Sequence, residues 1–90
     1  MKEDKTYIIS YDLAEGGDYN KLFEKLQSYP KWAHITGSTW AVLSCKSASE
    51  IRDEISEYLK TGSRLIVVES ANVAAWRNSI CSNEWLKNNI

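Results

Sequence analysis

The order of apolar patterns along the chain constrains its fold more than any other feature. Residues 6–13 read TYIISYDL, a run rich in β-branched and aromatic residues that is typical of a buried strand. After Asp18, apolar residues recur at helical spacing, which predicts a helix that Asp18 caps and Pro30 ends. The apolar positions of this helix are Tyr19, Leu22, Phe23, Leu26 and Tyr29.

The middle of the chain predicts a hairpin followed by a second helix. Two extended pieces, KWAHI and STWAVLS, meet at Gly37, where a tight turn or bulge is expected. Residues 47–50 read SASE, a capping-box pattern that opens a helix, and Gly62 is predicted as the residue just past its end. The apolar face of this helix comprises Ile51, Ile55, Tyr58 and Leu59.

The last third adds one strand and a tail. RLIVVES, residues 64–70, is a further strand pattern. ANVAAW, residues 71–76, is compatible with a short extended segment, and residues 82–89 predict a brief terminal helix that carries Trp85 and Leu86.

Strand, helix, two strands, helix and strand in succession predict a ferredoxin-like α+β sandwich, a single domain over residues 1–90. Both helices then cover one face of a four-stranded antiparallel sheet, and the other face is left bare. The chain has four tryptophans and five tyrosines, which make good interface anchors. We therefore expect a second copy to cover the bare face, so that the protein is a homodimer.

The charge, the cysteines and the hydropathy of the chain argue against several classes of protein. Eleven basic and twelve acidic residues give a formal net charge of −1, which argues against a general binder of duplex DNA. Cys45 and Cys81 belong to no CxxC pattern, so we expect two buried thiols and neither a disulfide nor a zinc site. Met1 is followed by Lys-Glu-Asp-Lys and no apolar run approaches the length of a membrane helix, so a cytoplasmic location is predicted.

Two short motifs carry a family resemblance. YIISYDL and, later, HITGSTWAV resemble the small CRISPR-associated endonuclease of the spacer-acquisition complex over about the first half of the chain. Nearly the full length is similar to the short proteins known as SinR-like. They share ISYDL, a W-A-H then S-x-W hairpin, S-A-x-x-I-R-D and a terminal W-L-K. VapD-type toxin ribonucleases resemble the same scaffold.

The resemblance implies a ferredoxin-like homodimer in which the last strand of each chain can add to the partner's sheet. It also implies that Asp12 of each subunit faces its twin across the two-fold axis. Two carboxylates placed so can hold a hard divalent cation such as Mg²⁺, which activates water against a phosphodiester. The expected alternative is that Asp12 only ends a strand and caps a turn.

This sequence also departs from the CRISPR-associated pattern. Residues 18–21 read DYNK where that family carries an arginine, Thr36-Gly37 replace a glutamine, and no basic surface is evident. The main expectation is therefore a dimeric binding module for a nucleotide or nucleic acid, with a role in defence as an adaptor or a phage inhibitor. The alternatives are a metal-dependent endonuclease that acts on RNA or DNA through paired Asp12, and a module that only binds other proteins.

The candidate site residues gather around Asp12, the candidate catalytic and metal-binding residue. Alternation along the strand places Ser10 and Asp12 on one face and Tyr7, Ile9 and Tyr11 on the face that meets the helices.

Two further candidates lie in the predicted hairpin. Ser38 is expected close to Asp12 and is, with Ser10, a candidate ligand contact. Trp40 is a candidate to stack on a base, and packing in the core or a dimer interface is the alternative.

Overall fold

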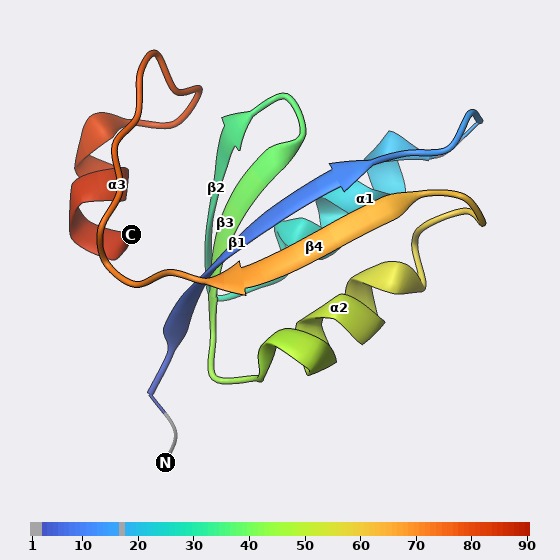
Figure 1. Ribbon diagram of the computed structural model, residues 1–90, viewed down its shortest axis with the longest axis horizontal. Coiled ribbons are helices and arrows are strands. Elements are labelled where there is room, and N and C mark those ends of the chain that lie inside the picture. The colour runs from blue at the N-terminus through green and yellow to red at the C-terminus, as the bar shows by residue number, and fades with distance from the viewer. Residues whose placement is uncertain (1–2, 17) are drawn as a thin grey trace.

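The computed structural model describes residues 3–16 and 18–90, which form one four-stranded antiparallel sheet and three helices (Figure 1). The elements are β1 Lys5–Asp12, α1 Tyr19–Leu26, β2 Lys31–Thr36, β3 Thr39–Ser44, α2 Ala48–Ser56, β4 Arg64–Glu69 and α3 Asn83–Asn89. This is the predicted succession of strands and helices. No helix formed by these residues is long and apolar enough to cross a membrane.

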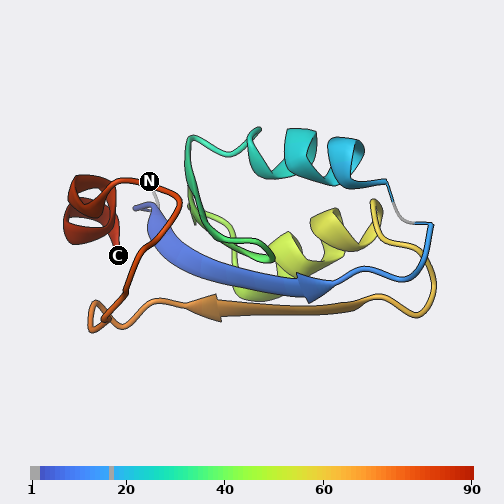
Figure 2. The same ribbon diagram turned by 90° about the horizontal axis from the view of Figure 1, so that it is seen from above.

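The strands lie in the order β2-β3-β1-β4, so β1 is central and β2 and β4 form the two edges. All three pairings are antiparallel, and Ile9 lies opposite Trp40 on β3 and Val67 on β4. The helices α1 and α2 lie on the same side of the sheet (Figure 2). We call that side the helix face and the opposite side the open face.

Alternation along β1 decides which side chains enter the core. Tyr7, Ile9 and Tyr11 are 2%, 0% and 3% exposed, whereas Ser10 is only half-buried and Asp12 is exposed. The predicted division of β1 between the two faces is thus confirmed. The core on the helix face comprises Tyr7, Ile9, Tyr11, Leu22, Leu26, Tyr29, Trp40, Val42, Ile51 and Ile55.

Helix α3 lies against part of the open face, which was expected to be bare. In both views the β2–β3 hairpin lies between α3 on one side and α1 and α2 on the other (Figures 1 and 2). Ala33 and Ala41 form a cross-strand pair that points away from the core on the helix face, yet both are buried, as is Leu86 of α3. The prediction of a wholly bare face is therefore wrong for its β2–β3 half, which the tail covers.

Hydrogen bonds hold the tail, residues 70–90, in place against the sheet. The Ile80 amide donates to the carbonyl of Ile35 at 2.9 Å, and the Ser70 hydroxyl donates to the carbonyl of Ile90 at 3.2 Å. The Thr6 hydroxyl also donates to the Asn89 carbonyl. These contacts place both ends of the tail against the sheet, so α3 is a part of the domain.

The helix starts agree with the sequence and the two predicted helix ends do not. Helix α1 ends at Leu26, before Tyr29 and Pro30, so Tyr29 lies in the loop that follows it. Asp18 accepts hydrogen bonds from the amides of Asn20 and Lys21, and Ser47 forms the complete capping box with Glu50. However, α2 ends at Ser56, so Gly62 is not its C-terminal cap.

Two segments near the end of α2 and after β4 also differ from expectation. The positive φ of Gly62, 95°, belongs to the turn that leads into β4. Residues 71–76 form no strand, and Asn72 at φ 64° lies in the left-handed region. Neither turn carries a sequence signal that helix or strand periodicity detects.

Glu54 of α2 ties the helix layer together. Its carboxylate accepts hydrogen bonds from Lys25 Nζ at 2.9 Å and from the Tyr29 hydroxyl at 3.0 Å, and it also accepts one from Lys46 Nζ. Burial opposes the charge of Glu54, but these three donors outweigh it and hold the pKa of its carboxyl down at about 2. These three hydrogen bonds to Glu54 join α1, α2 and the loops beside them.

Candidate functional site

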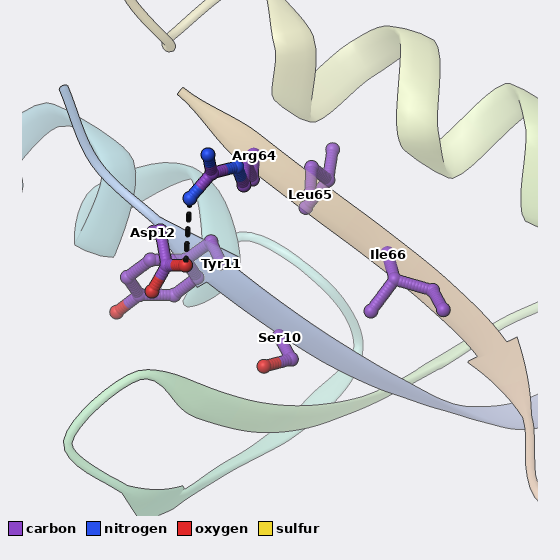
Figure 3. A pocket seen from close by; sticks show the side chains of 6 residues that line it. All are labelled: Ser10, Tyr11, Asp12, Arg64, Leu65 and Ile66. Carbon is purple, nitrogen blue, oxygen red and sulfur yellow. Dashed lines mark ion pairs between the residues drawn. The ribbon is translucent and has the colours of Figure 1, made fainter. Parts of the chain in front are cut away.

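The exposed end of β1 forms a shallow hollow on the open face. Its lining comes from two neighbouring strands, and its volume is about 190 Å³. The lining residues are Ser10, Tyr11, Asp12, Arg64, Leu65 and Ile66 (Figure 3).

Asp12 lies opposite Arg64 because β1 and β4 pair in that register. Asp12 Oδ2 and Arg64 Nη1 are 3.9 Å apart, and the two side chains are 75% and 85% exposed. An ion pair this long and this exposed contributes little to stability, so both side chains remain available to a ligand. Arg64 offers a fork of donors and Asp12 offers an acceptor beside it.

Two further residues complete the hollow. Ser10 lies two residues before Asp12 on the same face and opposite Thr39 of β3. Ile66 follows Arg64 on the open face and is 59% exposed, which adds an apolar surface next to the charged pair. The hollow thus combines a cation, an anion, a hydroxyl and a hydrophobic side chain.

Ser38 lies at the same end of β1. It occupies the exposed turn between β2 and β3, and its carbonyl accepts a hydrogen bond from the Tyr11 amide at 3.2 Å. The structure therefore brings the β2–β3 turn next to Asp12's strand end, as the sequence predicted. Ser38 does not belong to the lining of the hollow itself.

Trp40 has a different environment. It points to the helix face, is 1% exposed, and donates from Nε1 to the Tyr11 hydroxyl at 3.2 Å. Its ring stacks on that of His34, with the ring centres 4.3 Å apart and the planes 13° apart. In this structure Trp40 packs in the core and has no free ring face for a base. The tryptophan that is exposed on the neighbouring strand is Trp32, at 40%.

The residues that are present fit a divalent cation poorly within one chain. Among residues 3–16 and 18–90, no cluster of three or more His, Cys, Asp or Glu side chains is arranged to hold a metal ion. The charged neighbour of Asp12 is the cation Arg64. The predicted Mg²⁺ site at Asp12 relied on a second Asp12 supplied by another chain.

The cysteines lie away from this hollow. Cys45 and Cys81 are free thiols, and Cys45 is exposed while Cys81 is half-buried. The prediction that both thiols are buried is wrong, because β3 ends one residue before Cys45 and the chain there turns into solvent towards α2.

The sequence missed Arg64 as a member of the site. Residues 12 and 64 are far apart along the chain, and only the β1–β4 register brings them together, so no local pattern pointed to Arg64.

No family model, curated protein or solved structure gives a significant match to this chain.

Proposed function

We propose that this protein is a binding module for a nucleotide or a short stretch of nucleic acid, and that it works as a homodimer on a ferredoxin-like scaffold of the SinR-like type. Support for the scaffold comes from the strand order β2-β3-β1-β4, in which β1 lies between β3 and β4, with α1 and α2 on one face. The proposed role in defence follows from the resemblance of the ISYDL and S-x-W motifs.

The observation that supports this function best is the exposed Arg64 beside Asp12 and Ser10. A guanidinium is suited to bind a phosphate through two hydrogen bonds. The carboxylate of Asp12, 3.9 Å from Arg64, can accept a hydrogen bond from a sugar hydroxyl or a base amino group.

A metal-dependent endonuclease is the second candidate function, and it needs more than one chain provides. It depends on a second Asp12 brought to the first by another copy, together with Mg²⁺. Because the charged group beside Asp12 is Arg64, we place binding without cleavage first. A module that binds only proteins is the third candidate function.

Binding can be tested by titrating the protein with mononucleotides and with short single-stranded RNA and DNA. Replacing Arg64→Gln should weaken the affinity at least about tenfold, since a charge-assisted contact to phosphate contributes about 1.5–3 kcal/mol. Arg52→Gln is the matched control, because Arg52 is an exposed arginine paired with Asp53 on α2. No binding by the wild type, or equal losses in the two variants, would contradict the proposal.

The same samples separate binding from cleavage. With Mg²⁺ present, the binding module should leave labelled RNA and DNA intact at all times. Cleavage by the wild type that Asp12→Asn abolishes would instead establish the endonuclease.

A further inference from the structure

Strand β4 is an edge strand with unpaired backbone groups. The Ser70 amide donates to the Thr6 carbonyl at 2.8 Å, so the residue at position 70 directs its backbone polar groups towards β1. In an antiparallel ladder this direction alternates from residue to residue. The N–H and C=O groups of Leu65, Val67 and Glu69 therefore point away from the sheet, and no described residue hydrogen-bonds to them.

The side chains along this edge are apolar. Ile66 and Val68 are 59% and 48% exposed on the open face, and Leu65 and Val67 are only half-buried on the helix face. A groove of about 350 Å³ runs between the edge and α2. Its lining comprises Ala48, Ser49, Arg52, Leu65, Ile66 and Val67.

The other edge strand, β2, has features that discourage it from pairing with a strand of another chain. Pro30 precedes β2, Lys31 begins it, and a bulge between His34 and Thr36 breaks its register. The tail also bonds to it, through the hydrogen bond from Ile80. Edge strands are usually protected from association in these ways. Between its charged ends, Arg64 and Glu69, β4 reads LIVV and has no proline, charge or bulge.

We infer that β4 pairs antiparallel with β4 of a second copy, with Val67 opposite Val67 at the two-fold axis. This deepens the homodimer part of the proposed function and rests on it. Because Val67 points its backbone groups outward, the pair at the axis exchanges two hydrogen bonds. The same register pairs Leu65 with Glu69 on the helix face, and both of these also direct their backbone groups outward.

This register also suits the side chains. On the open face it places Ile66 directly opposite Val68 of the partner, and the reverse, so four exposed β-branched side chains bury one another. The two Arg64 side chains lie at opposite ends of the paired strands, as do the two Glu69 side chains. No like charges therefore lie opposite each other in this register. For this reason a second copy of the chain is the occupant that fits the β4 edge.

The arrangement has a consequence for the candidate site. Asp12 lies opposite Arg64, three residues from Val67 along β4. At a rise of about 3.3 Å per residue, the two Asp12 residues of this dimer are at least about 20 Å apart. The dimer thus presents two separate hollows on one continuous sheet, which favours binding over a shared carboxylate pair.

Register-specific crosslinking tests the pairing. In a chain with Cys45→Ser and Cys81→Ser, Ile66→Cys and Val68→Cys are made separately. Directly opposite, non-hydrogen-bonded positions have Cα atoms about 4.5 Å apart, within the range for a disulfide. A mixture of the two variants should form disulfide-linked dimers under mild oxidation, and each variant alone should do so much more slowly. Equal crosslinking of each variant alone, or none in the mixture, would overturn the register.

The mass in solution provides the second measurement. Light scattering at micromolar concentration should give a dimer for the wild type and a monomer for Val68→Lys. Ile80→Lys is the matched control, because Ile80 is also exposed, at 63%, but lies in the tail, and it should remain a dimer. A monomeric wild type, or a dimeric Val68→Lys, would overturn the inference. Ligand titration remains a separate readout of the hollow.

Discussion

The two faces of the sheet differ sharply although they share the same strands. On β1, Ile9 is fully buried under the helices, whereas its neighbour Ile8 is only half-buried on the open face. The two isoleucines are chemically identical, and only the alternation of side chains along the strand separates them. The helix face therefore stabilises the domain, and the part of the open face that the tail does not cover is free to interact.

The open face is itself divided. Its β2–β3 half is covered by the tail, since Ala33, Ala41 and Leu86 are all buried. Its β1–β4 half carries the exposed pair of Asp12 and Arg64. The tail thus restricts the surface available to a ligand or a second copy to one half of the sheet.

The largest expected effect comes from truncating the two neighbouring isoleucines. Ile9→Ala should lower the free energy of unfolding by about 2–5 kcal/mol, because it leaves a cavity in the core. Ile8→Ala removes the same atoms from a half-exposed site and should cost less than half as much. Urea unfolding of both variants measures the difference, and similar losses would show that the open face is as tightly packed as the helix face.

A smaller effect is expected at Glu54, whose carboxylate joins α1, α2 and the neighbouring loops on the helix face. The carboxyl of Glu54 has a pKa of about 2, below its ordinary value of 4.5, so its contribution to stability is fully present above about pH 4.5. That contribution, about 1–3 kcal/mol for three hydrogen bonds to a charged group, is lost as the pH falls from 4.5 towards 2.

Thermal unfolding of Glu54→Gln between pH 2 and 7 tests this effect, with the wild type as the reference. The variant should be less stable at neutral pH and should lose less stability on acidification. Parallel pH curves for the two proteins would contradict the assignment.

The smallest effect is expected at the candidate site itself. Asp12→Asn and Arg64→Gln should each change the free energy of unfolding by less than about 0.5 kcal/mol, because the pair is long and exposed. Chemical unfolding at low and high salt provides the measurement. A loss above 1 kcal/mol in either variant would mean that this pair serves the fold rather than a ligand.

Local patterns in the sequence were sufficient for most of the secondary structure. The alternation in residues 6–13 predicted the two faces of β1, and Asp18 and the SASE box predicted where both helices begin. These signals act between residues a few positions apart, so periodicity and capping chemistry reveal them. The ends of α1 before Tyr29 and of α2 before Gly62 were missed, because a turn that ends a helix early leaves no periodic signal.

What only the tertiary structure decided is how distant segments meet. The sequence alone determined that Asp12 ends an apolar strand and faces away from the helices. The β1–β4 register then placed Arg64 beside it, and the return of the tail buried Ala33, Ala41 and Leu86. Such contacts join residues dozens of positions apart, and their energy depends on the packing of the whole domain rather than on any local pattern.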